Sequence, residues 1–288
     1  MALPDWLKIR HIENDKSSAI AAMMKRLKLH SVCQSAHCPN RSECWAAGTA
    51  TFMVMGERCT RGCRFCAVKT MSKPPPLDPD EPAKLADAVS TLGLRYVVVT
   101  SVTRDDLPDG GAGHIASCVK ALKEKMPNLI VEILVPDFQG DGKAVGIVAM
   151  SGADVLSHNV ETVERLTPAV RDTRAGYRQS LAVLRMFGKL SGGKAVVKSG
   201  LMVGMGESAE EVEQTLRDLR EAGVELVTMG QYLAPSKAHF PVAEYVRPER
   251  FKEYETLAYS LGFTHVASGP LVRSSYKAAE PFMKGQLR

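Results

Sequence analysis

Six of the seven cysteines lie within residues 33–66, and they form two sets of three. The second set, Cys59, Cys63 and Cys66, has the spacing C-x3-C-x2-C in a short polar segment. Three thiolates so placed can hold three irons of a [4Fe–4S] cluster and leave the fourth iron open to a small molecule. A zinc site or a purely structural cluster is the alternative, but each usually needs a fourth nearby ligand. The pattern therefore favours an iron–sulfur centre at which a reaction can occur.

The first set, Cys33, Cys38 and Cys44, has the spacing C-x4-C-x5-C. Three thiols this close in sequence indicate a second cluster site. Zinc completed by His37 and thiols that bind no metal are the alternatives. Adjacent residues such as His37 and Cys38 rarely bind one ion together, and no pair of histidines with ligand spacing follows. We therefore expect two iron–sulfur clusters in one chain.

The composition places these cysteines in a folded protein of a reducing compartment. The chain has 288 residues, of which 45% are hydrophobic, so it can bury the core of one large α/β domain or two small ones. An odd number of cysteines and a charged N-terminal segment argue against disulfides and secretion. The sequence lacks the long apolar run of a membrane span, and its net charge of +5 is too small to indicate nucleic acid. A cytoplasmic protein without membrane or nucleic-acid partners is expected.

The segments that must position the cysteines alternate between short β-rich runs and longer amphipathic runs, the pattern of parallel βαβ units. Strands are predicted at residues 51–55, 96–101, 129–135, 154–157, 196–203, 226–231 and 264–267. Helices are predicted at residues 17–29, 82–93, 114–125, 142–151, 177–190, 207–222 and 248–261. The alternation favours a complete or partial β/α barrel, with a doubly wound open sheet as the alternative.

Polar segments follow four of the predicted strands, at residues 57–66, 103–111, 158–161 and 204–207. In a barrel the C-terminal ends of the strands share one face, and the chemistry of barrel enzymes lies there. The cysteines of the second set belong to the first of these segments. This coincidence supports the barrel, because the choice of strands does not depend on it.

Six residues at or near these strand ends are candidate cofactor contacts: Arg104, Asn159, Glu161, Lys198, Gly204 and Glu207. Asn159 and Glu161 can hydrogen-bond sugar hydroxyls or an amine, or they can cap a helix. Gly204 lets a ligand approach the backbone and Glu207 adds a carboxylate, unless the segment is an ordinary turn.

Two basic residues among these candidates leave a similar choice. Arg104, beside Asp105, can orient a cofactor or substrate, or it can belong to a salt-bridged loop. Lys198 can reach into the barrel from an apolar strand, or it can extend its ammonium to solvent. Cys118 stands apart from both cysteine sets in an amphipathic segment, where a small core or surface thiol is expected.

The longer motifs resemble the lipoyl synthase family of radical S-adenosylmethionine (SAM) enzymes. The resemblance begins with CQSAHCPNRSECW and TATFMVMGERCTRGCRFCAV, in which Phe65 precedes the last cysteine as in the radical SAM signature. It continues through YVVVTSVTRDDLPDGGAGH, VPDFQG, SHNVETVERL, VKSGLMVGMGE, GQYLAPSKAHFPV and SGPLVRSSYKA, in the family's order, over residues 30–278. Ser157 departs from the asparagine that the family commonly has at that position.

The resemblance implies a partial (β/α)6 barrel of the TIM type at residues 49–268, with an N-terminal extension at 1–48 and a C-terminal tail at 269–288. It implies that Cys59, Cys63 and Cys66 hold the radical SAM cluster and that the segment with Gly204 and Glu207 is part of the SAM pocket, and it favours SAM contacts for Asn159 and Glu161. The first cysteine set would hold an auxiliary [4Fe–4S] cluster with Ser275, the second serine of RSSY, as fourth ligand. Residue types alone would make RSSY an ordinary polar tail. A serine oxygen is a hard ligand on a soft site and can release its iron more easily than a thiolate.

The family reaction is the insertion of two sulfur atoms at C6 and C8 of an octanoyl group on a carrier-protein lysine. It uses two SAM molecules and takes its sulfur from the auxiliary cluster. The implied partners are octanoylated lipoyl-carrier domains (2-oxoacid dehydrogenase E2 or glycine-cleavage H protein), a low-potential electron donor and an iron–sulfur carrier that rebuilds the cluster. The alternatives are another radical SAM sulfur-inserting enzyme, acting like biotin synthase on a free small molecule, and a non-enzymatic iron–sulfur protein.

Overall fold

The computed structural model describes residues 3–8, 15–35, 38, 40–46 and 51–275, and the structural statements that follow concern these residues. The main sheet has eight strands: β1 (His30–Ser31), β2 (Thr51–Val54), β5 (Tyr96–Ser101), β6 (Ile130–Leu134), β7 (Val155–Ser157), β8 (Val196–Val203), β9 (Leu226–Gln231) and β10 (His265–Gly269). Strand β1 pairs antiparallel with β2, and all the other pairs are parallel. Two short strands, β3 (Arg58–Cys59) and β4 (Lys69–Thr70), form a separate pair.

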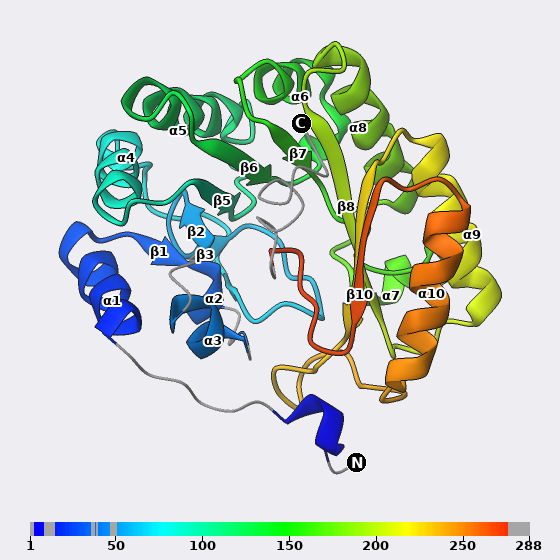
Figure 1. Ribbon diagram of the computed structural model, residues 1–288. Helices are drawn as coiled ribbons and strands as arrows, with labels where there is room; N and C mark the ends of the chain where they lie inside the picture. The colour runs from blue at the N-terminus through cyan, green and yellow to red at the C-terminus, as the bar shows by residue number, and fades with distance from the viewer. Residues whose placement is uncertain (1–2, 9–14, 36–37, 39, 47–50, 276–288) are drawn as a thin grey trace.

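One long helix connects each pair of consecutive parallel strands. These helices are α4 (Glu81–Thr91), α5 (Ala112–Lys125), α6 (Gly142–Ala149), α8 (Tyr177–Leu190), α9 (Ala209–Glu221) and α10 (Pro248–Ser260). They surround the outside of the curved sheet (Figure 1). The parallel strands follow one another in sequence order, whereas a doubly wound sheet reverses direction at a switch point. The predicted partial (β/α)6 barrel is therefore confirmed, with β10 as a seventh parallel strand.

The long strands are rich in apolar residues and mostly buried, because both of their faces are covered. In β5, YVVVTS, five of the six residues are buried, and β9 is buried throughout. Helix α9 begins two residues later than predicted, at Ala209, because Ser208 and Glu211 form a capping box there. Within the described residues, no helix has both the length and the apolar character that crossing a membrane requires.

Two of the N-terminal cysteines, Cys33 and Cys44, lie on short helices that follow the edge strand β1. The predicted first helix is α1 (Asp15–Leu27), and it is followed by α2 (Val32–Ser35) and α3 (Arg41–Ala46). Helices of four and six residues are too short to show a helical period in the sequence, so neither was predicted. The remaining short elements are η1 (Asp5–Leu7), η2 (Phe138–Gly140), η3 (Glu164–Leu166) and α7 (Thr167–Val170).

A buried ion pair crosses three strands of the barrel. Lys198, on β8, places Nζ 2.7 Å from Oε1 of Glu132 on β6, and both side chains are at most 1% exposed. The hydroxyl of Tyr96, on β5, donates to the other oxygen of Glu132. The ammonium is thus paired inside the protein and does not extend to solvent. Contact of Lys198 with the cofactor stays a prediction.

We expect Lys198→Met to lower the free energy of unfolding by about 3–5 kcal/mol, because it leaves the Glu132 carboxylate buried without its cation. Urea titration followed by circular dichroism measures this change. The double variant Lys198→Met/Glu132→Leu is the matched control, and it should recover most of the loss because it removes both charges. A single variant within about 1 kcal/mol of wild type would show that the pair is not needed for stability.

Candidate active site

The second cysteine set lies on the loop between β2 and α4, which crosses the middle of the ring of strands (Figure 1). Cys59, Cys63 and Cys66 are half-buried, and none is in a disulfide. Burial raises the pKa of the Cys63 thiol and raises the pKa of Cys66 to about 12. Thiols in such surroundings stay protonated near neutral pH unless a metal takes the proton's place. A metal would therefore have to displace these protons, and it is the presence of three cysteines on one short loop, none of them in a disulfide, that fits a metal cluster.

Backbone groups already point at two of these sulfur atoms. The N–H of Arg61 donates to Cys59 Sγ at 3.4 Å, and the N–H of Asp172 donates to Cys63 Sγ at 3.3 Å. Asp172 also accepts the N–H of Gly62 at 2.8 Å, between the two cysteines. Donors of this kind favour the charged form of a sulfur ligand. The loop is thus held in a shape that suits thiolate ligands.

Arg61 anchors the loop to the barrel from within the cysteine motif. Its guanidinium pairs with Asp105 at 2.8 Å and with Asp137 at 2.7 Å, and its side chain is 4% exposed. Burial alone would raise the pKa of Asp137, but the hydrogen bond from Arg61, the nearby positive charges and the N–H of Gln139 together outweigh it and hold that pKa at about 2. These carboxylates follow β5 and β6, so the loop is fixed to two neighbouring strand ends. The sequence did not indicate this anchoring role of Arg61. The only local sign of it is the position of an arginine between two candidate cluster ligands.

The other predicted residue of this segment, Arg104, is engaged elsewhere. Its guanidinium is buried and makes two hydrogen bonds of 2.8 Å with Asp106. This is the salt-bridged loop that the sequence left as the alternative. Asp105 pairs with Arg61 and Arg174 instead. A cofactor contact of Arg104 stays a prediction.

Asn159 and Glu161 follow β7 and lie on the same side of the barrel as the cysteine loop. Glu161 has left-handed backbone, with φ +68°, and burial raises the pKa of its carboxyl, although Arg171 and Asn159 oppose the shift. Its charge acts on Cys63 and Cys66, which places it beside the cluster loop. Strained backbone of this kind is concentrated at functional sites.

The carboxamide of Asn159 shows that a polar partner fits here. Its Nδ2 donates to Ser274 Oγ at 2.6 Å, but its buried Oδ1 has no hydrogen-bond partner among the described residues. Buried polar atoms are normally paired, so the orphaned oxygen and the carboxyl of Glu161 fit a ligand that carries an amine or hydroxyls. The methionyl and ribose groups of SAM have these donors.

Glu207 shapes the glycine turn after β8. Its carboxylate accepts the N–H groups of Gly204 and Met205, the latter at 2.9 Å. Gly204 has φ +98°, and a Cβ there would lie 2.2 Å from Nε2 of Gln231. The space that Gly204 leaves beside its backbone is therefore occupied by the side chain of Gln231, where a ligand was expected. Contacts of Gly204 and Glu207 with a cofactor stay predictions.

The C-terminal tail comes back to the first cysteine set. Nδ2 of Asn40 donates to the carbonyl of Leu271 at 2.6 Å, and Thr51 Oγ1 donates to Ser275 Oγ at 2.9 Å. Burial, and then Cys33, raises the pKa of Cys38, whereas the charge of Arg273 lowers it. Residues more than 200 positions apart are thus neighbours, as a shared site requires. His37, the alternative zinc ligand, and residues 276–288 lie outside the described residues.

This barrel, with a three-cysteine loop at its mouth, defines a radical SAM enzyme. Residues 53–219 match the family model described as "Radical SAM superfamily". The fold resembles the FeFe-hydrogenase maturase HydG from Carboxydothermus hydrogenoformans, with a TM-score of 0.58, 10% identity, and coverage of 94% of this chain and 79% of that one. Membership implies a [4Fe–4S] cluster and SAM.

Within this class, the chain belongs to the lipoyl synthase family. It is 55% identical to "Lipoyl synthase" of Anaeromyxobacter sp. (strain Fw109-5), over 99% of this chain and 96% of that one. It is 52% identical to "Lipoyl synthase, mitochondrial" of Aedes aegypti, over 100% of this chain and 74% of that one. The relatives thus include an organellar protein, and a cytoplasmic location stays a prediction.

Proposed function

We propose that this chain is a lipoyl synthase, a sulfurtransferase that inserts two sulfur atoms at C6 and C8 of an octanoyl group on a carrier-protein lysine. Identity of 52–55% along nearly the whole chain to relatives of that name is the observation that carries the proposal. When bound, the cluster and SAM supply the one-electron chemistry that removes hydrogen from unactivated carbon. A free octanoate-like acid as substrate is the alternative, and an assay of both substrates separates the two.

In this proposal the chain has three parts with distinct tasks. Cys59, Cys63 and Cys66, in the barrel at 49–268, hold the radical SAM cluster, while Asn159 and Glu161 receive the amine or hydroxyls of SAM. The extension at 1–48 and the tail at 269–288 hold the auxiliary cluster.

The four proposed ligands of the auxiliary cluster are Cys33, Cys38, Cys44 and Ser275. That cluster is consumed as the sulfur donor, so it is a substrate as well as a ligand of the protein. The position of Ser275 beside Thr51, near the first cysteine set, supports this assignment.

The hydrogen bond between Asn159 and Ser274 supports the idea that the two sites act on one substrate. Asn159 is a proposed SAM contact, and Ser274 precedes the proposed auxiliary-cluster ligand. A carbon activated at the first site therefore has only a short path to a sulfur at the second. An octanoyl group on the flexible lysine arm of a carrier domain can reach between them, and docking of that domain raises its local concentration. A low-potential electron donor and an iron–sulfur carrier complete the proposed set of partners.

Counting iron and sulfide under anaerobic conditions tests the two-cluster assignment. We expect about eight irons per chain in wild type and about four in the variant Cys33→Ala/Cys38→Ala/Cys44→Ala. The reduced-state EPR signal that survives should still respond to SAM. About four irons in both proteins would show that the first cysteine set holds no cluster. The sulfur-insertion proposal would then fail, and only the assignment as a radical SAM enzyme would remain.

A further inference from the structure

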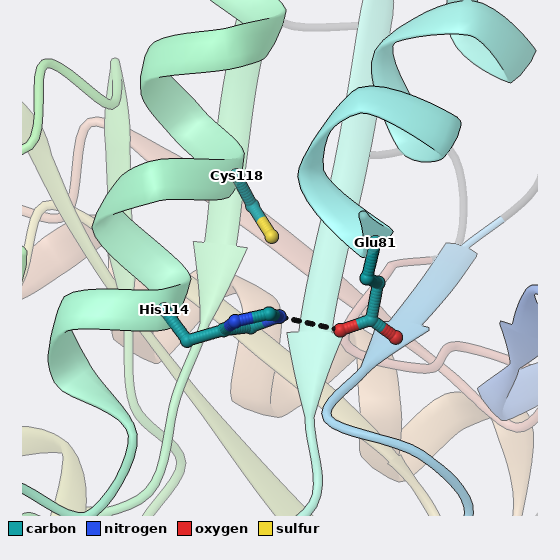
Figure 2. A group of neighbouring side chains, drawn as sticks. All are labelled: Glu81, His114 and Cys118. Atoms are coloured by element: carbon teal, nitrogen blue, oxygen red, sulfur yellow. Dashed lines mark hydrogen bonds and ion pairs between the residues drawn. The ribbon is translucent and has the colours of Figure 1, made fainter. Parts of the chain in front are cut away.

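A carboxylate and an imidazole meet at the end of β2, outside the cysteine sets (Figure 2). Glu81 begins α4, and its Oε2 accepts the backbone N–H of Met55 at 2.9 Å. The same oxygen lies 2.6 Å from Nε2 of His114, in the first turn of α5. Because a carboxylate has no proton to give, the imidazole N–H donates this bond. Both side chains are at most 10% exposed.

Met55 is the residue on which this pair acts. It has φ +68°, a left-handed conformation that is unusual for a residue other than glycine, and its side chain is buried. Its Sδ fills the space at Gly111, where a Cβ would lie only 2.2 Å from that sulfur. Such backbone persists only where its surroundings impose it. At Met55, the hydrogen bond from its N–H to Glu81 and the packing of its side chain against Gly111 together impose the left-handed conformation.

The position of Met55 in the chain gives this constraint its meaning. Gly56, also left-handed at φ +86°, follows it, and Cys59 is four residues away on β3. The turn at residues 55–56 therefore sets the direction in which the cluster loop leaves the barrel. Arg61 and Asp172 hold the later part of the same loop. The Glu81–His114 pair holds its beginning.

We propose that Glu81 and His114 are positioning residues for the radical SAM cluster, fixing the backbone of Met55 so that Cys59 meets its iron. The proposal rests on Cys59, Cys63 and Cys66 being the ligands of that cluster. His114 acts one step further away, because it holds the Glu81 carboxylate in place beneath Met55. Both residues lie on helices outside the three-cysteine loop.

Cys118 offers a competing explanation of the same group. Its sulfur, one helical turn beyond His114, completes a set of ligand atoms within 4.8 Å of one another, which could hold a metal ion (Figure 2). Against a metal, Oε2 of Glu81 is already shared by two N–H donors. The thiol is fully buried, and this burial raises its pKa far above the usual value, which opposes the thiolate that a metal needs. Hydrogen bonding therefore explains the group better than metal binding.

Three variants of the reconstituted holoenzyme test the proposal. Glu81→Ala removes the acceptor, and we expect kcat/KM for SAM cleavage to fall roughly 10–100-fold, as misplaced reacting groups do. Its reduced EPR signal with SAM should broaden into a mixture of species. Glu81→Gln keeps an oxygen for the N–H of Met55 and should restore both the rate and the EPR signal. Cys118→Ala is the matched control and should leave both unchanged.

The outcomes separate the proposal from its alternatives. The auxiliary cluster, with about four irons, should survive in Glu81→Ala and report that the chain is folded. If Glu81→Ala cleaved SAM as fast as wild type, the positioning role would be overturned. It would also be overturned if Glu81→Gln failed to restore the rate. A metal ion bound by wild type and lost in Cys118→Ala would replace the proposal with a metal site. If wild type itself does not cleave SAM, the proposed function fails first.

Discussion

Cys63→Ala should reduce SAM cleavage to the level of a sample without enzyme. Cys63 is the central residue of the C-x3-C-x2-C loop, and the N–H of Asp172 already points at its sulfur. In the proposed site, loss of this thiolate leaves one iron without its only protein ligand and disturbs the open iron that would bind SAM. Because the reaction starts at that iron, no other residue of the chain can replace the lost step. Chromatography of 5′-deoxyadenosine and methionine after anaerobic reduction measures the effect.

The matched control is Cys118→Ala, which also removes one thiol but lies on α5, outside both cysteine sets. It should cleave SAM at the wild-type rate. The iron count of Cys63→Ala should fall by about four, with the auxiliary cluster kept. Cleavage by Cys63→Ala above a few per cent of wild type would mean that the radical SAM cluster has different ligands.

The elements of the barrel could be predicted because each strand and helix carries its own signal. The run YVVVTS at β5 is β-branched and apolar, as a strand buried on both faces requires, and the prediction has the same bounds as the structure. Helix α8, Tyr177–Leu190, was predicted with its observed bounds because its apolar positions repeat with a helical period. Such signals lie within a few consecutive residues.

The contacts that shape the site could not be predicted in this way, because they join residues far apart in the sequence. The pairing of Arg61 with Asp137 spans 76 positions, and the bond of Asn159 to Ser274 spans 115. Periodicity carries no information about which loops meet above the sheet. Arg104 and Asp105 are neighbours in the sequence, but they do not pair with each other. In the structure Asp105 pairs with Arg61, and Arg104 pairs with Asp106. Only the motif resemblance connected Ser275 to the first cysteine set.

Cys44→Ala should separate the two halves of the proposed reaction. SAM cleavage should continue, because Cys44 lies on α3 in the N-terminal extension and the cluster loop keeps its own three cysteines. Formation of lipoyl product should stop, since the sulfur donor is assembled on the ligand set that this substitution breaks. Mass spectrometry of an octanoylated carrier domain, together with the deoxyadenosine yield, measures both halves in one sample.

Ser275→Cys sharpens this test, because it changes the hardness of one ligand and keeps the number of ligands. If the serine oxygen is the tether that releases its iron easily, a thiolate in its place should preserve the iron count and slow sulfur insertion. Cys44→Ala should abolish insertion, and Ser275→Cys should retain a slower reaction with normal SAM cleavage. Lipoyl product from Cys44→Ala at the wild-type level would end the sulfur-donor role of the first cysteine set. Insertion by Ser275→Cys at the full wild-type rate would show that release of the serine ligand does not limit the reaction.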